Sequence, residues 1–271
     1  MVTSGRGTGR DLVAPRGWEP VDAGTLAAAR DRACQGLSQV LDDSVDLGTL
    51  SASEMSRALE LLTIAEPDDS FHIDPSDMFA ASCMAPLPPL HATVEVLRPG
   101  PLRTNISRHL LRLVGAPPLP HSDAATLNTM WDLDRALQPL ASHAPPRPAN
   151  FAAVLCARKR PGHFPLRHHH VRTYLGAAHS PDMSPLELFS RDVRTAGYLL
   201  ADPAVLGLLD CIRRRMREHA VEDDTERGTW VLGVENLRLL DTLLLNFAAT
   251  LHGRPLGTAL EDYEGSHRVH C

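Results

Sequence analysis

The most informative absence in this sequence is that of acidic residues over residues 135–181. This 47-residue window contains no Asp or Glu, whereas 33 acidic side chains in 271 residues would place about six there by chance. The window has a net charge of +7, although the whole chain has a net charge of −6. A basic segment in an acidic protein typically faces an anion, such as a phosphate, a nucleic acid or a carboxylate substrate.

Aromatic residues are also scarce, at 4% of the chain, although the hydrophobic content is an ordinary 43%. The core must therefore be built mainly from Leu, Ala and Val, which favours helix over strand. We expect an all-α protein with a single multi-helix domain over residues 21–257. A disordered tail at 1–20 and a polar tail at 258–271 are expected to flank it.

Several motifs that would define a function class are absent. No stretch approaches the ~18 consecutive apolar residues that span a bilayer, and the first 17 residues lack the apolar region of a signal peptide. The five cysteines are scattered and include no CxxC pair, which predicts reduced thiols and a cytoplasmic protein without a membrane partner. GxSxG, GxGxxG and P-loop motifs are missing too, so we expect no cofactor.

Lysine is nearly absent, since Lys159 is the single lysine among 27 basic residues. A bias towards arginine is typical of a GC-rich genome and indicates an actinobacterial-type source. The lone lysine can then be a product of chance. Alternatively, an ammonium is needed at this position, because it is a compact point charge that a planar guanidinium does not replace.

Hydrophobic periodicity and capping signals predict a series of helices with little or no sheet. Residues 91–97 could form either a helix or a strand, and caps are expected at Ser51, Asn150, Ser184 and Asp202. The predicted helices span about 22–41, 51–64, 76–85, 104–114, 123–140, 151–158, 169–175, 184–200, 203–219 and 234–251.

The centre of the basic window contains a recognisable motif. It reads Val154-Leu155-Cys156-Ala157-Arg158-Lys159-Arg160-Pro161, then Phe164-Pro165-Leu166 and Val171-Arg172-Thr173-Tyr174-Leu175-Gly176. This block resembles an actinobacterial family of uncharacterised proteins, the domain of unknown function 6308. Looser matches at 77–82, 131–132 and 237–241 extend the resemblance over roughly residues 77–247.

The family pattern is in turn similar to that of the helix-hairpin-helix DNA glycosylases. That similarity implies a helical frame, a glycine-rich hairpin that contacts a phosphate, and an Asp near the sugar of a flipped nucleotide. This sequence departs from the pattern twice, since Pro146-Arg147-Pro148 contains no glycine and Arg167-His168 no carboxylate. The similarity therefore implies the helical frame and a basic face rather than glycosylase chemistry.

The candidate site residues come from the motif at 154–176, called the basic block below, and from one apolar helix. We expect Lys159, His168 and Asp241 to be catalytic, because each can move a proton or orient an anion. The plain alternatives are a solvated helix end, surface histidines, and an Asp241 that faces solvent or pairs with an arginine. The ligand-binding candidates are Arg158, Arg160, His163, Arg167, His169 and Arg172.

We also expect these cations to share one concave basic surface, with at least one of residues 158–160 beside Arg167 or Arg172. A metal site is not predicted, because the block contains no HxxxH or HExxH pair. Adjacent helical histidines cannot all bind one ion, so a metal would need a distant partner, such as Asp241, Asp132 or His72.

Two functions of different classes follow from these features. The first is a helical protein that recognises a phosphate- or carboxylate-bearing ligand, with DNA or RNA among the candidates, through a basic face at 135–181. The second is an enzyme of specialised metabolism that acts on a small anionic substrate, with Lys159, Arg160 and His168 or His169 in its pocket. The net charge of −6 opposes tight nonspecific nucleic-acid binding, whereas the local charge of +7 favours an anionic partner.

Overall fold

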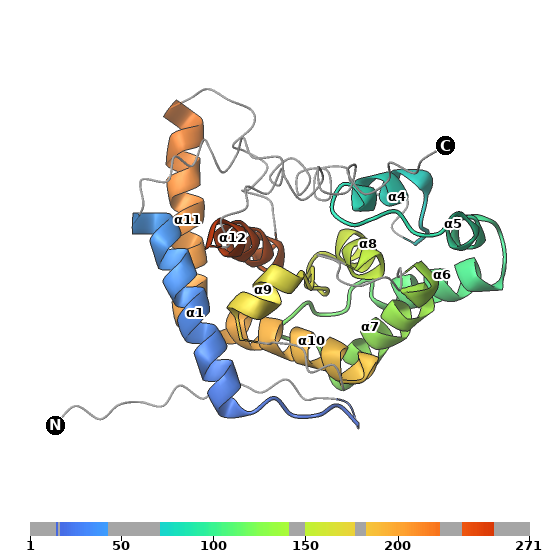
Figure 1. Cartoon of the computed structure of the whole chain (residues 1–271), viewed down its shortest axis with the longest axis horizontal. Helices are drawn as coiled ribbons and strands as arrows, with labels where there is room; N and C mark the ends of the chain where they lie inside the picture. Colours follow the sequence, from blue (N-terminus) through green and yellow to red (C-terminus); the bar gives the residue numbers. More distant parts are fainter. Residues whose placement is uncertain are drawn as a thin grey trace, which may run out of the picture.

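Helices account for all of the regular secondary structure in the residues that the structure describes. The structure is a computed structural model, and it describes residues 15, 17–42, 71–140, 150–176, 183–222 and 235–251. Within these ranges there are ten α-helices, one 3-10 turn and no strand, and the helices share one hydrophobic core in a single domain (Figure 1). The all-α prediction is confirmed.

The helices follow the predicted order closely. Residues 91–97, where helix and strand were both open, form a helix. The predicted helix at 51–64, its cap at Ser51 and the polar tail at 258–271 lie outside the described residues. The helices are α1 (Ala23–Asp42), α4 (Pro75–Ser82), α5 (Leu90–Leu97), α6 (Pro101–Arg112), α7 (Ala124–Leu137), α8 (Phe151–Lys159), α9 (His169–Tyr174), α10 (Pro185–Ala201), α11 (Pro203–Glu222) and α12 (Asn236–Leu251), with the 3-10 turn η1 (Gln138–Leu140) after α7.

Short polar side chains cap α8, α10 and α11 at the positions that the sequence predicts. Ser184 and Glu187 form a reciprocal capping box at the start of α10. The Asn150 side chain accepts a hydrogen bond from Ala152 N at 2.9 Å at the start of α8, and Asp202 accepts one from Ala204 N at 2.8 Å in α11. Each cap satisfies an N–H group that has no partner within its own helix.

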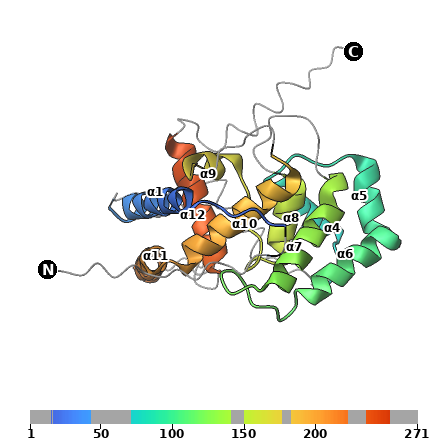
Figure 2. The same cartoon turned by 90° about the horizontal axis from the view of Figure 1, so that it is seen from below.

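The helices form two groups that lie side by side. Helices α1 and α9–α12 make up one group and α4–α8 the other, as Figures 1 and 2 show from perpendicular directions. The connection from α8 to α9, residues 160–168, passes from one group to the other. The basic block of the sequence therefore lies at the junction of the two groups.

Helix α8 is the buried centre of this arrangement. Its sequence, FAAVLCARK, is apolar on every side over the first seven residues, which is typical of a fully enclosed helix. All nine of its residues are buried, and it packs against α4 and α7. The two cations at its C-terminal end are consequently carried into the interior.

A cluster of aromatic side chains surrounds Phe189 on α10. The ring of Phe189 lies 5.6 Å from Trp18, 5.3 Å from Trp131 and 6.5 Å from Phe164, measured between centroids. Trp18 belongs to the segment expected to be a disordered tail, yet it is buried in the core. That expectation does not hold for Trp18, because burying its large apolar side chain in the core lowers the free energy compared with leaving it in solvent.

Within the described ranges, no single helix is long and apolar enough to cross a membrane. Helix α10 and residues 203–218 of α11 meet the length and composition criteria only as a pair, and the two are bent by 73° at their junction.

Candidate functional site

Two cations at the end of α8 share one buried carboxylate. Arg158 Nε lies 2.7 Å from Asp77 Oδ1, and Lys159 Nζ lies 2.7 Å from Asp77 Oδ2. All three side chains are at most 1% exposed. Asp77 also belongs to the capping box of α4, so these ion pairs fasten α8 to the start of α4.

Arg160 and His163 lie in the turn that follows α8. Arg160 donates from Nη1 to the Lys159 carbonyl at 2.7 Å and from Nη2 to the Leu110 carbonyl at 2.6 Å. Burial and, to a smaller extent, the positive charge of Arg160 together lower the pKa of His163 to about 4, against a hydrogen bond with the Ala116 backbone that opposes the shift. His163 is therefore neutral at pH 7, and the two hydrogen bonds of Arg160 hold the turn in place.

Arg167 is held in an unusual backbone conformation. Its φ angle is +54°, in the left-handed region, which is a strained position for a residue with a side chain. The guanidinium is buried in an ion pair with Asp134 on α7 and lies 5.1 Å from the centre of the Phe189 ring. These two contacts compensate for the backbone strain, because both are lost if the residue rotates away.

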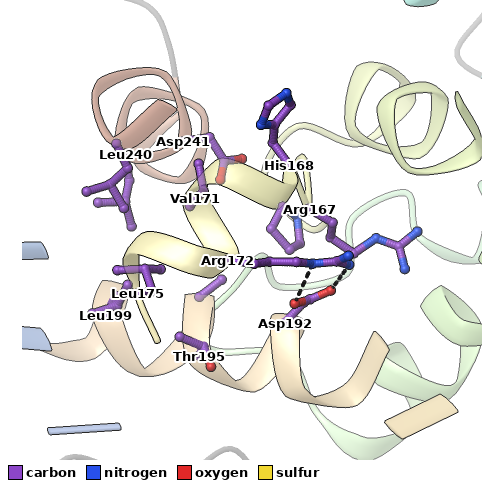
Figure 3. Close-up of a pocket in the computed structure, with 13 residues that line it drawn as sticks. Arg167, His168, Val171, Arg172, Leu175, Asp192, Thr195, Leu199, Leu240 and Asp241 are labelled. Carbon is purple, nitrogen blue, oxygen red and sulfur yellow. Dashed lines mark hydrogen bonds and ion pairs between the residues drawn. The ribbon is translucent and has the colours of Figure 1, made fainter. Parts of the chain in front are cut away.

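A small pocket lies between α9, α10 and α12 (Figure 3), with a volume of about 40 Å³. Of the predicted site residues, the structure brings Arg167, His168, Arg172 and Asp241 to its wall. The other five predicted site residues do not line it, namely Arg158, Lys159, Arg160, His163 and His169.

Arg172 and Asp192 form a two-point ion pair in this pocket, drawn as dashed lines in Figure 3. Arg172 Nε donates to Asp192 Oδ1 at 3.0 Å, and Nη2 donates to Oδ2. The Arg172 side chain is 18% exposed, compared with 5% for Arg167 and 1% for Lys159. Among these three ion-paired cations, Arg172 is the one that a solute can reach most readily.

The concave basic surface expected from the sequence is not formed, and that prediction is wrong. Arg158, Lys159, Arg167 and Arg172 pair with carboxylates, and Arg160 donates to backbone carbonyls, so these cations do not form a shared surface facing solvent. Asp77 on α4, Asp134 on α7 and Asp192 on α10 supply these carboxylates, and all three lie outside the acid-free window 135–181. A charged group costs several kcal/mol to bury alone, so the fold supplies in three dimensions the acids that the window lacks.

Asp241 is the second carboxylate at the wall of the pocket, besides Asp192, and it is also largely buried. Its Oδ2 atom accepts hydrogen bonds from Leu166 N at 3.0 Å and from Arg238 Nη1 at 3.2 Å. Burial raises the pKa of Asp241 to about 6, although Arg238 and the Leu166 N–H counteract part of the shift. A carboxyl group that titrates near neutral pH at the wall of a pocket is typical of functional sites.

Arg238 is a site residue that the sequence analysis missed. It is fully buried and donates from Nη2 to the carbonyls of Ala157 at 3.0 Å and Phe164 at 3.3 Å, besides its bond to Asp241. It thereby ties α12 to the end of α8 and to the turn beyond it. An Arg three residues before an Asp on an apolar helix was the available signal, because that spacing places both on one face.

His168 directly precedes α9 and serves as its N-terminal cap. Its Nδ1 atom accepts a hydrogen bond from His170 N at 3.3 Å, and in Figure 3 its ring points away from Asp192. Burial lowers the pKa of His168 to about 3, with smaller contributions to that shift from His169, His170 and Arg172. His168 is therefore neutral at pH 7. Among the described residues, no group of three or more His, Cys, Asp or Glu side chains could hold a metal ion.

The comparison with known families identifies the chain as a member of one of them. It belongs to a family of unknown function, DUF6308, whose model matches residues 60–247. The match covers the basic block, all three walls of the pocket and Asp77. No curated protein and no solved structure matches the chain.

Proposed function

We propose that this protein recognises a small anionic ligand in the pocket between α9, α10 and α12. The observation that carries the proposal is the position of Arg172, which is partly exposed at the wall of a cavity while its neighbours in the basic block are enclosed. A guanidinium presents a planar fork that suits carboxylate and phosphate groups. Arg172 is thus the cation of the block best placed to meet a ligand.

The size of the pocket limits the ligand to a small molecule. A volume of 40 Å³ has room for about three water-sized molecules, so the pocket suits a ligand of at most about six non-hydrogen atoms. A nucleotide base is several times larger. The pocket therefore supports a small anion rather than a flipped base or a nucleotide cofactor.

Binding of DNA or RNA has less support from the geometry. A protein that binds a polyanion places several accessible Lys or Arg side chains along a surface. Arg158, Lys159, Arg160 and Arg167 are instead all buried. The distant similarity to helix-hairpin-helix DNA glycosylases, the actinobacterial source and the cytoplasmic location stay predictions from the sequence.

A second candidate function, an enzyme that acts on the same small anion, is favoured by Asp241. Its Oδ2 atom accepts both of its hydrogen bonds from described residues, and its pKa of about 6 suits a general acid or base near neutral pH. In this reading Arg172 orients the substrate and Asp241 transfers a proton. Lys159 would support the site only indirectly, through α8.

Calorimetric titration with phosphate, acetate and butanoate tests the proposal. A ligand of about six non-hydrogen atoms contributes at most about 9 kcal/mol, so micromolar to millimolar dissociation constants are expected. We expect Arg172→Lys to weaken binding about tenfold without changing the melting temperature, because it keeps the charge opposite Asp192 but loses the fork.

Arg135→Lys is the matched control, since Arg135 lies on α7 and its side chain is 68% exposed. This control should bind like the wild-type protein. Equal affinity in both variants, or heat from none of the three anions, would overturn the proposal.

A further inference from the structure

The pocket has an apolar end and a polar end. Figure 3 shows Leu175, Leu199 and Leu240 on one side of the cavity and the Arg172–Asp192 pair on the other. Val171, Ala196 and Leu244 also contribute aliphatic surface to the wall. An inorganic ion would leave that surface without a partner, whereas a ligand with a hydrocarbon part would bury it, at about 25 cal/mol per Å².

The polar end limits the charge of the ligand. Two arginines and two carboxylates line the pocket, namely Arg167, Arg172, Asp192 and Asp241, so their formal charges cancel. A carboxylate 4 Å from an added negative charge opposes it by about 4 kcal/mol at an effective dielectric constant of 20. A dianion such as phosphate would meet this repulsion twice, so a single negative charge fits better.

The pocket also contains polar groups that lack partners among the described residues. The Thr195 hydroxyl is buried in the wall and makes no hydrogen bond there. Both hydrogen bonds that Asp241 accepts reach Oδ2, so its Oδ1 atom is available for a further bond. A buried polar atom without a partner costs about 1–3 kcal/mol, and a polar ligand group would relieve that cost.

We propose that the ligand is a short-chain aliphatic monocarboxylic acid, with its chain against the leucines and its carboxyl group between Arg172 and Asp241. The complex holds one proton between the ligand and Asp241 Oδ1, taken up from solution when the carboxylate anion binds. Apart from the O–H bond that this proton forms, no covalent bond forms or breaks. This inference rests on the proposed function, and it adds the class of ligand and its coupling to a proton.

The surroundings of Asp241 make it the group that takes up this proton. The charged and titratable groups that face it are Arg238 on its own helix, Asp192 on α10, Arg172 on α9, and Arg167 and His168 in the connection before α9. His168 stays neutral because its pKa lies at about 3. The Asp241 pKa of about 6 allows uptake at neutral pH when a second carboxylate arrives.

Calorimetry with acetate, butanoate, phosphate and succinate, in two buffers of different protonation enthalpy, tests this inference. We expect butanoate to bind more tightly than acetate and both dianions, with close to one proton taken up per butanoate. Above pH 6.5 the affinity should fall about tenfold per pH unit, because the proton becomes scarcer. Asp241→Asn should abolish this pH dependence.

Asp210→Asn is the control, since Asp210 lies on α11 and its side chain is 77% exposed; it should behave like the wild-type protein. If Asp241→Asn does not fold, the number of protons that the wild-type protein takes up per butanoate is sufficient to test the inference. Binding of phosphate or succinate in preference to butanoate, or butanoate binding without proton uptake, overturns this inference and leaves the proposed function standing. No binding of any of the four anions overturns both.

Discussion

At the scale of single residues, the basic block is built from cations that have carboxylate or carbonyl partners. Asp77 is the clearest case, because Arg158 and Lys159 each lie 2.7 Å from one of its two oxygens. The lone lysine thus has a structural use that the sequence could not show. Its partner lies 82 residues earlier in the chain, and nothing in the local pattern around either residue links the two.

Asp77→Asn should destabilise the protein by about 3–5 kcal/mol, because it leaves buried cations without their shared carboxylate. Urea unfolding monitored by circular dichroism measures the free energy of unfolding. Asp210→Asn, at an exposed position, should change it by less than about 0.5 kcal/mol. A loss below about 1 kcal/mol in Asp77→Asn would contradict the role of Asp77.

The buried titratable groups predict how stability depends on pH. His163 and His168 have folded pKa values of about 4 and about 3, below the ordinary 6.5, so stability falls as pH drops below about 6.5. Asp241 acts in the opposite direction, because its folded pKa of about 6 exceeds its ordinary 3.8 and its protonation on folding favours the native state below pH 6.

Between pH 4 and 6 the unfolded state therefore binds two protons at these histidines, and the native state binds one at Asp241. The free energy of unfolding should rise with pH by about 1.4 kcal/mol per pH unit from these groups. His168→Gln should bring that slope close to zero, and Asp241→Asn should roughly double it. Urea unfolding at pH 4.5, 5.0, 5.5 and 6.0 measures the slopes, and equal slopes in both variants would contradict the assignments.

At the scale of helices, the sequence predicted almost all that lies within the described residues. Amphipathic spacing and short-range caps such as Ser184 and Asn150 depend on residues within one turn of each other, so a single sequence contains the necessary information. The local pattern does not record contacts between residues that are far apart in the sequence. Such contacts determine the order of the helices in space, the hydrogen bonds from Arg238 to the Ala157 and Phe164 carbonyls, and the burial of Trp18.

Two glycines provide a matched test of this local structure. Gly176 ends α9 with a φ of +75°, and a Cβ placed there would lie 1.8 Å from Arg32 Nη1. Gly207 lies within α11, and a Cβ there would meet nothing within 4 Å. Gly176→Ala should therefore destabilise the protein by at least about 1 kcal/mol, whereas Gly207→Ala should stabilise it by about 0.5–1 kcal/mol.

Thermal unfolding of the two variants beside the wild-type protein measures both effects. The two melting temperatures should move in opposite directions. A rise in melting temperature for Gly176→Ala would mean that the left-handed turn after α9 is not needed to position the pocket wall.

At the scale of the whole molecule, the charge distribution predicts weak binding to nucleic acids. The chain has a net charge of −6, and the cations at the end of α8 are buried. The logarithm of any association constant for a 20-base-pair DNA, plotted against the logarithm of the salt concentration, should have a slope shallower than about −2. Such a slope corresponds to about two phosphate contacts. Fluorescence anisotropy between 50 and 300 mM NaCl measures this slope, and a value of −4 or steeper would contradict the enclosed basic block.

The central claim, that a small anion binds at Arg172, is tested most directly by its guanidinium resonance. The Nε–H signals of arginines labelled with ¹⁵N can be followed by NMR while butanoate or phosphate is added. We predict a saturable shift of the Arg172 signal with one or both ligands, and no shift of the signal of the exposed Arg135. A linear, salt-sensitive shift of Arg135 with an unchanged Arg172 signal would contradict the claim.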